Sequence, residues 1–439
     1  MAELVNDDRS PRAIRLGRIA ALLRVAAGVL GWLAVFLALA GLLGGITGGD
    51  LFDLLSRLIA GYDGAADTAL LVMILLILAN LSAFLVLMIG VGAGEFWSPP
   101  VLAGLLAVNV ALVLWLGFIP ALIPIGFAAY ALALMAGDIG AFRVNPLMLK
   151  EVRERMRGAR SFVVMTVYLG LMSAFAVIIY LIETQSGSAV GTSVTGELGR
   201  NLFRGVVGLQ LFLIVFIAPA FTAGAVSSER ERKTYDLLQI TLLPHQSFII
   251  GKLESALAYI LLLLLAAVPL QSIAFLFGGV TELELLTALA VLAVTAITFG
   301  TIGLYFSTTL DRTLTASTRA YIAIFMLTIA VPMVIIVVTS VFRQFFVTAV
   351  GSSAVLQAGI IYLRGFAESL NPAIVLLQTQ DLLISNRGSM GFYTEPIFDG
   401  VLLTGVPLPS PWLALTITYL LISAVMIVLS VRGLRDRDA

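Results

Sequence analysis

Apolar stretches of about 20 residues follow one another along nearly the whole chain, with short polar connections between them. A helix needs about 20 mostly apolar residues to cross a hydrocarbon core roughly 30 Å thick. Scanning on that length finds ten candidates, near residues 24–46, 68–93, 100–117, 119–136, 162–182, 206–227, 253–278, 284–308, 320–342 and 411–431. The sequence therefore predicts an all-α polytopic membrane protein with about ten transmembrane helices that lie in a lipid bilayer.

The composition agrees with this reading and removes most classes of enzyme. Only 12% of the residues are charged, about half of what a soluble domain carries. The absence of cysteine excludes disulfides and thiolate sites, and a single histidine, His245, excludes multi-histidine metal sites. The formal net charge is zero, so no basic field indicates a nucleic-acid partner. We expect no catalytic residues, no metal and no cofactor in this chain.

The third and fourth apolar stretches come from one run that is too long for a single crossing. Gly117 and Pro120 break this run, because proline lacks a backbone donor and disfavours helix in the residue before it. We therefore expect a helical hairpin and an even number of spans. Of the 26 Lys and Arg residues, 20 fall in the segments that this topology places on the side of both termini. The positive-inside rule then predicts a multi-pass plasma-membrane protein with both termini in the cytoplasm.

The polar breaks divide the chain into five parts. We expect an Arg-rich cytoplasmic tail at 1–23, a four-helix bundle at 24–136, a cytoplasmic linker with an amphipathic helix at 137–161, a six-helix domain at 162–432, and a cytoplasmic tail at 433–439. The first tail is either mobile or a helix lying on the membrane. Within the six-helix domain, residues 183–205 are rich in Gly, Ser and Thr and predict a loop. The outward segment 343–410 contains two short apolar runs, 354–363 and 372–384, which we interpret as short helices packed on the outer face.

The first charged segment of interest begins at Asn145, and Asn145 and Pro146 suit the first turn of a helix. Apolar residues follow at helical spacing on one face, at Leu149, Val152 and Met156. The other face carries two i,i+4 pairs, Lys150–Glu154 and Glu151–Arg155. The pattern indicates a basic amphipathic helix in the membrane interface. Anchoring by basic residues explains part of it and does not exclude a mechanical role.

The second charged segment runs from Ser227 to Lys252. Ser228 and Glu231 match a capping box, which predicts a short helix that Pro244 ends. Acids and bases are equally prominent in it: Glu229, Glu231 and Asp236 against Arg230, Arg232 and Lys233. An ordinary positive-inside loop needs no such mixture, whereas a docking surface for another protein does. Gly251 and Lys252 lack the rest of a phosphate-binding loop, and we expect Lys252 to snorkel at the membrane boundary.

The six later spans carry no acid or base near their middle. Ion-coupled transporters usually place ionisable side chains there, so energy for uphill transport would have to enter from outside the membrane. The neutral polar residues in these spans are expected to pack between helices, and they include Gln210, Thr222, Gln271, Ser272, Thr295, Thr298 and Thr328.

Residues 145–432 resemble the type 2 ABC exporter permeases, the membrane subunits that work with a separate ABC ATPase. The likeness rests mainly on the opening Asn145-Pro146 with Lys150-Glu151 and on Glu229, Glu231, Thr234, Leu238, Pro244 and Gly251-Lys252. Two weaker matches are Gly303–Ser307 with Arg312 and Ala316, and Leu370-Asn371-Pro372. Lys233 departs from the family pattern, which has a glycine there, and Tyr235 and Asp236 replace the usual Leu and Glu.

The resemblance implies a six-span permease core, a partner ATPase, and a homodimer or a heterodimer with a second permease. It implies an ATPase-coupling helix at about 229–239, with the residues Glu229, Arg230, Glu231, Arg232, Thr234, Asp236 and Leu237. It implies a connecting helix with Asn145, Pro146, Lys150, Glu151 and Arg155, and a boundary at Gly251 and Lys252. Residues 1–140 have no counterpart in the family, and we expect them to form an accessory bundle.

We therefore expect a transport subunit, not an enzyme, that couples ATP hydrolysis by its partner to movement of a substrate. The alternative is a stand-alone channel or secondary carrier. A partner ATPase that co-purifies with the chain would favour the first reading, because the alternative needs none. A membrane enzyme is the third reading, and it fails because no convergent acid, base and nucleophile are present.

Overall fold

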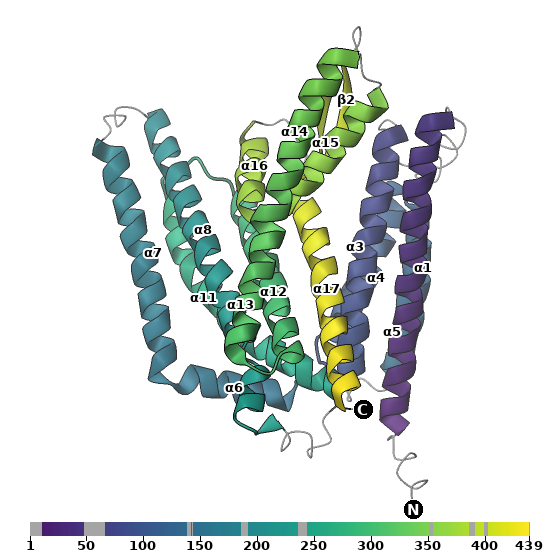
Figure 1. The fold of residues 1–439 in the computed structure, drawn as a ribbon, viewed down its shortest axis with the longest axis vertical. Helices are drawn as coiled ribbons and strands as arrows, with labels where there is room; N and C mark the ends of the chain where they lie inside the picture. The colour runs from purple at the N-terminus through teal and green to yellow at the C-terminus, as the bar shows by residue number, and fades with distance from the viewer. Residues whose placement is uncertain are drawn as a thin grey trace, which may run out of the picture. The chain divides into compact units, whose positions relative to one another are not determined.

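The computed structural model describes residues 11–47, 66–137, 142, 144–185, 192–235, 244–350, 354–385, 391–398 and 403–438. These residues are almost all helical, as Figure 1 shows, and they confirm an all-α polytopic architecture. The chain divides into two compact units. The first comprises Met1–Pro146 and Leu242–Gly251, and the second comprises Leu147–Thr241 and Lys252–Ala439.

Residues 11–47 and 66–136 of the first unit form four helices. They are α1 (Pro11–Thr47), α3 (Ala66–Ala93), α4 (Ser98–Leu116) and α5 (Leu122–Ala136), with a short 3-10 turn η1 (Ile119–Ala121) before α5. Helix α1 packs along α3, and α4 packs along α5. The predicted break between α4 and α5 is confirmed: Gly117 ends α4 in the left-handed region at φ 58°, which glycine adopts without a steric penalty.

The second unit contains the remaining elements. They are α6 (Pro146–Arg157), α7 (Ala159–Gln185), α8 (Thr192–Thr222), α9 (Ser227–Glu231), α11 (His245–Leu276), α12 (Glu282–Thr309), α13 (Thr313–Phe325), the π-helical segment η3 (Met326–Ala330), α14 (Val331–Val350), α15 (Ala354–Ser369), α16 (Pro372–Ile384), β1 (Phe392–Phe398), β2 (Leu403–Pro409) and α17 (Pro411–Asp438). The first turns of α11 belong to the first unit and the rest of it to the second.

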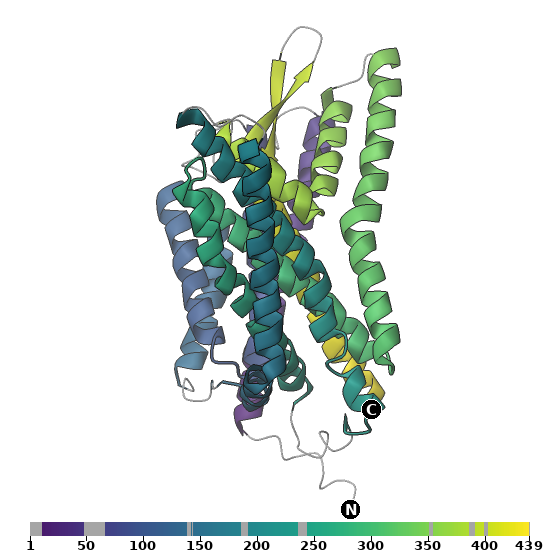
Figure 2. The same ribbon diagram turned by 90° about the vertical axis from the view of Figure 1, so that its left-hand side faces the viewer.

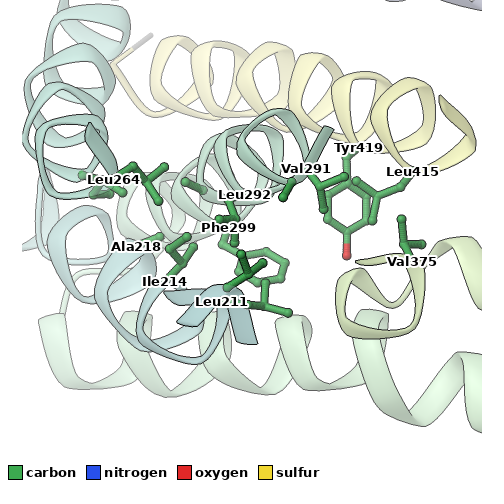
Figure 3. Packing of buried hydrophobic residues seen from close by; sticks show 14 of the residues in the cluster. Leu211, Ile214, Ala218, Leu264, Val291, Leu292, Phe299, Val375, Leu415 and Tyr419 are labelled. Carbon is green, nitrogen blue, oxygen red and sulfur yellow. The ribbon is translucent and has the colours of Figure 1, made fainter. Parts of the chain in front are cut away.

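Helix α12 is the centre of the second unit, where it packs against α8, α17 and α13. Figure 3 shows part of this core, in which Val291, Leu292 and Phe299 of α12 lie among side chains of the neighbouring helices. The buried Tyr419 of α17 donates a hydrogen bond of 2.7 Å from its hydroxyl to the carbonyl of Leu370. Two of the expected contacts between helices form, since Gln271 donates to Gln210 and Thr298 bonds to Ser423 of α17. The other hydroxyl groups donate to carbonyls of their own helices, namely those of Thr222, Ser272, Thr295 and Thr328.

Helices α8 and α12 approach closely at Gly303. A Cβ atom at this position would lie 3.2 Å from the Cα of Pro219 and 3.3 Å from the backbone nitrogen of Ala223, and nearer still to the Thr222 hydroxyl. Small residues permit such contacts between membrane helices. Gly303 is therefore needed for the packing of α12 against the proline-containing turn of α8.

Nine helices in the described part of the chain are long and apolar enough to cross a membrane. A tenth crossing would come from α15 and α16, which pass the same test together but are bent by 112° at residues 370–371. The apolar part of α4, Ser98–Leu114, is shorter than a full span. The expectation of about ten transmembrane helices is thus confirmed, although the predicted span at 100–117 is not among the nine long helices and the possible tenth is the bent α15–α16 pair.

Two predicted boundaries differ from the structure. Residues 192–205, predicted as part of a loop, form the first turns of α8. Residues 11–23, predicted as a mobile tail or a separate helix on the membrane, form the first turns of α1. The glycines of α8 explain the first error, because they serve close packing: a Cβ at Gly199 would lie 2.8 Å from the carbonyl oxygen of Ala274. In α1 the arginines alternate with apolar residues at helical spacing, so the helix continues through them.

The segment after α14 combines a predicted and an unpredicted feature. The two short apolar runs form α15 and α16, as expected, and Asn371 caps α16 by accepting from the backbone nitrogen of Ala373 at 2.9 Å. The antiparallel β1–β2 hairpin, paired from Phe392↔Pro409 to Phe398↔Leu403, was not predicted. Figure 2 shows this hairpin at the top of the view, level with the end of α14, and it shows α13, η3 and α14 as one long rod.

Candidate functional site: a charged cluster around Lys252

Lys252 of α11 is a buried cation held between two carboxylates. Its side chain is 7% exposed, and its Nζ lies 2.5 Å from Oε1 of Glu151 on α6 and 3.1 Å from Oε1 of Glu229 on α9. The prediction that Lys252 snorkels at the membrane boundary is therefore wrong. The ammonium group turns inward because two acids on separate elements provide a partner charge for it.

Hydroxyl groups complete this cluster. Ser255, one turn after Lys252, donates to the second oxygen of Glu151 at 2.6 Å. Thr234 donates to the second oxygen of Glu229. Each carboxylate is thus bound by the ammonium and by one hydroxyl, which is the degree of satisfaction that a buried ion pair requires. We call Glu151, Glu229, Thr234, Lys252 and Ser255 the Lys252 cluster.

The backbone of α9 brings Glu229 and Thr234 together. The helix ends in a Schellman motif, in which Thr234 N–H donates to the Glu229 carbonyl at 2.9 Å and Lys233 N–H donates to the Arg230 carbonyl at 3.0 Å. Lys233 occupies the left-handed position of this motif at φ 57°, where glycine is usual. It is also the position at which the sequence departs from the glycine of the permease pattern.

Glu231 caps a different helix from the one predicted. Its carboxylate accepts from the backbone nitrogen of Thr313 at 2.8 Å and from the Thr313 hydroxyl at 2.9 Å, at the amino terminus of α13. The predicted capping box is wrong, because Ser228 instead donates to the Gly224 carbonyl at 2.5 Å. A carboxylate at a helix amino terminus is favoured by the helix dipole.

Further bonds join the same loop to the turn between α12 and α13. The Ser307 hydroxyl accepts from the backbone nitrogens of Val226 at 2.8 Å and Ser227 at 3.0 Å. Arg230 donates to the carbonyl of Thr308 at 3.0 Å, and its guanidinium lies 5.1 Å from the centre of the Tyr235 ring. The loop is therefore fastened to α12 and α13 as well as to α6 and α11.

Helix α6 lies crosswise to α7 in Figure 1, and none of its residues is fully buried. Leu149 and Met156 remain exposed on its apolar face, as expected for a helix in a lipid interface. Neither predicted i,i+4 pair forms a salt bridge among the described residues, because Glu151 turns to Lys252 and the Arg155 guanidinium lies 5.6 Å from the Phe221 ring centre. Burial lowers the pKa of Arg155 from its ordinary value, and the charges of Glu151 and Glu154 partly oppose that shift.

In the first unit, Asn145 joins two segments that are far apart in sequence. Its side-chain amide donates to Oε1 of Glu95 at 2.9 Å and to the carbonyl of Ser247 at 2.7 Å. A Cβ atom at Gly251 would lie 2.9 Å from this amide nitrogen. Gly251 is therefore required for Asn145 to pack against the start of α11. No pattern in the sequence indicated that Glu95 takes part.

The other predicted residues of the two segments fall into three groups. Arg232 and Lys233 are exposed at the end of α9, and Lys150 is exposed on α6. Pro146 occupies the first position of α6. Asp236 and Leu237 lie outside the described residues. Within the part of the chain that the structure describes, no group of three or more His, Asp or Glu side chains is arranged to hold a metal ion.

No protein-family model matches this chain. No curated protein shows significant similarity to it.

Proposed function

We propose that the chain is the permease subunit of an ATP-driven ABC exporter, which works with a separate ABC ATPase. The observation that supports this most is the salt bridge from Lys252 to both Glu151 and Glu229. Glu151 comes from the first motif that resembles the permease pattern, and Glu229 and Lys252 come from the second. Because the side chains of Glu151, Glu229 and Lys252 meet in one buried cluster, their occurrence together in the permease pattern has a physical reason.

The contacts of the Lys252 cluster would allow this region of the chain to transmit force. The α9 loop follows α8 directly, bonds to α6 and α11 through the Lys252 cluster, and bonds to α12 and α13 through Ser307 and Glu231. A push on this loop would therefore reach the ends of several membrane helices at once. Rigid movement of packed helices about such a contact is a common way to switch between two conformations.

The surface that meets the ATPase is proposed to include Arg232 and Lys233, which are exposed. Glu229 and Glu231, which the resemblance also assigns to coupling, have partners within the chain and would act by holding the loop in place. The α6 end, defined as α6, α9 and residues 307–313, would face the cytoplasm of the plasma membrane with both termini. The first unit would be an accessory bundle, and two permease units would pair as a homodimer or heterodimer.

The partner is tested by purifying the tagged chain from its native membranes and measuring ATP hydrolysis in the eluate. We expect an ABC ATPase subunit to co-purify with the wild-type chain. Arg232→Glu should weaken this association at least tenfold, whereas the matched change Arg319→Glu on α13 should leave it intact. Substrate flux through the purified chain with no ATPase present would instead support a channel or secondary carrier.

Orientation is tested separately with single cysteines, since the chain contains none of its own. A cysteine at Ser193 should react with a membrane-impermeant maleimide added to intact cells, and one at Ser317 should not. Reaction at Ser317 from outside would reverse the proposed orientation and remove the cytoplasmic contact with an ATPase.

A further inference from the structure

A cavity of about 160 Å³ lies in the second unit between α8, α12 and α16. Most of its wall is apolar and includes Phe203, Val207, Leu211, Val291, Leu376 and Leu377. Glu284, Thr379 and Gln380 also line it. Glu284 is in the first turn of α12, whereas Ser307 is in its last, so nearly the whole length of α12 separates this cavity from the Lys252 cluster.

Glu284 is a buried acid without a cationic partner among the described residues. It is 3% exposed, and its carboxylate accepts from the Thr281 hydroxyl at 3.1 Å and from the Gln380 amide at 3.4 Å. Both donors are neutral. The amino terminus of α12 favours the charged form of this carboxylate, but a buried charge is costly until an opposite charge compensates it.

Arg204 also lines the cavity, but its guanidinium already has two partners. Arg204 donates from Nη2 to Asp381 at 2.8 Å and from Nε to the Gln380 side-chain oxygen at 2.8 Å. Arg204 and Asp381 therefore neutralise each other and leave the charge of Glu284 as the net charge at the polar end of the cavity.

Thr379 provides a second, independent indication of a ligand. It is 6% exposed and lines the cavity, and its hydroxyl oxygen has no hydrogen-bond partner in the structure. Buried hydroxyl groups nearly always have a partner. An unsatisfied hydroxyl beside an uncompensated carboxylate is the arrangement that a donor with a positive charge would complete.

We propose that this cavity binds the primary ammonium group of an amphipathic molecule, with its apolar chain along α8 and α16. The ammonium would donate to Glu284 and to the Thr379 hydroxyl, and the apolar wall would cover the chain. Either a free alkylamine or a lipid with an ethanolamine head supplies this chemistry. The site needs no ATPase, so its test is independent of the proposed function.

The test measures binding of n-octylammonium to the full chain in phosphatidylcholine nanodiscs by calorimetry, with empty nanodiscs as the blank. We expect n-octylammonium to bind and octanoate not to bind. Octyltrimethylammonium, which has no N–H donor, should bind at least tenfold more weakly than octylammonium. Glu284→Gln should weaken octylammonium at least tenfold, as loss of a charge-assisted hydrogen bond predicts. Thr379→Val should weaken it several-fold.

Two further variants separate the site from general effects. Glu282→Gln changes an exposed acid in the same helical turn and should leave the affinity unchanged. Gly208→Leu adds a side chain at a cavity glycine whose Cβ would meet nothing within 4 Å, and it should block binding while Glu284 remains. Wild-type affinity in both Glu284→Gln and Gly208→Leu, or equal binding of octanoate, would overturn the proposal.

The source of the ammonium group is resolved by adding phosphatidylethanolamine to the nanodiscs. If phosphatidylethanolamine weakens the binding of octylammonium to the wild type, the site is assigned to a lipid head. Unchanged octylammonium affinity assigns it to a free amine. Both results uphold the site.

Discussion

The two ends of α12 are both lined with polar side chains, but those side chains are satisfied in different ways. At the α6 end, Lys252 meets two carboxylates and each carboxylate also meets a hydroxyl. At the other end, and within the described part of the chain, the carboxylate of Glu284 accepts only from neutral donors and the Thr379 hydroxyl has no partner. A satisfied cluster holds elements together, whereas an unsatisfied one has capacity left for a ligand.

The largest effect is expected from breaking the satisfied end. Lys252→Met would leave Glu151 and Glu229 without their cation, and removing one partner of a buried ion pair costs about 3–5 kcal/mol. The free energy of unfolding in mixed detergent and dodecyl sulfate micelles should fall by about that amount. Adding Glu151→Gln and Glu229→Gln to the same chain should restore most of it, because no unpaired charge would remain.

A smaller loss is expected where α12 meets α8 between the two ends. Gly303→Val should lower the free energy of unfolding by about 1–3 kcal/mol, since overpacking forces the backbones of Gly303 and Pro219 apart. Gly170→Ala on α7 is the control, because a Cβ there meets nothing within 4 Å. Equal unfolding curves for both variants would show that the two helices are not in close contact at Gly303.

Lys233→Gly should stabilise the chain by about 0.5–1 kcal/mol in the same unfolding measurement. The left-handed conformation costs a non-glycine residue about 1–2 kcal/mol, and the greater flexibility of glycine in the unfolded chain offsets part of this gain. Lys233→Ala keeps the strained conformation and should give no stabilisation. A stabilisation by alanine equal to that by glycine would argue against the Schellman motif.

The smallest effect on stability is expected at the unsatisfied end. Glu284→Gln removes a buried charge that has no cation among the described residues. The free energy of unfolding should therefore not fall, and it should rise by less than about 1 kcal/mol, because the amino terminus of α12 already offsets part of the cost of the charge. A loss as large as that of Lys252→Met would show that Glu284 is paired within the fold, and it would remove the contrast between the two ends of α12.

The apolar stretches of about 20 residues identify the fold as that of a polytopic membrane protein, and they also predict where most of the helices lie. Contacts between distant residues were harder to foresee. Local spacing suggested Glu151–Arg155 and Ser228–Glu231 pairs, but Glu151 instead reaches Lys252, 101 positions along the chain, and Glu231 reaches Thr313. A sequence pattern shows which charges lie on a helix face and does not show what faces them. The β1–β2 hairpin was missed because its strands contain prolines and lack strict alternation.

The central claim is that the Lys252 cluster carries force from a partner ATPase to the membrane helices. The most direct test is ATP hydrolysis by the reconstituted complex, with the wild-type chain compared with the triple variant Glu151→Gln, Glu229→Gln and Lys252→Met. The triple variant keeps the exposed Arg232 and Lys233, so it should still bind the ATPase. We predict that its stimulation of ATP hydrolysis falls at least tenfold. Normal binding together with wild-type stimulation would contradict the claim and leave the cluster a purely structural role.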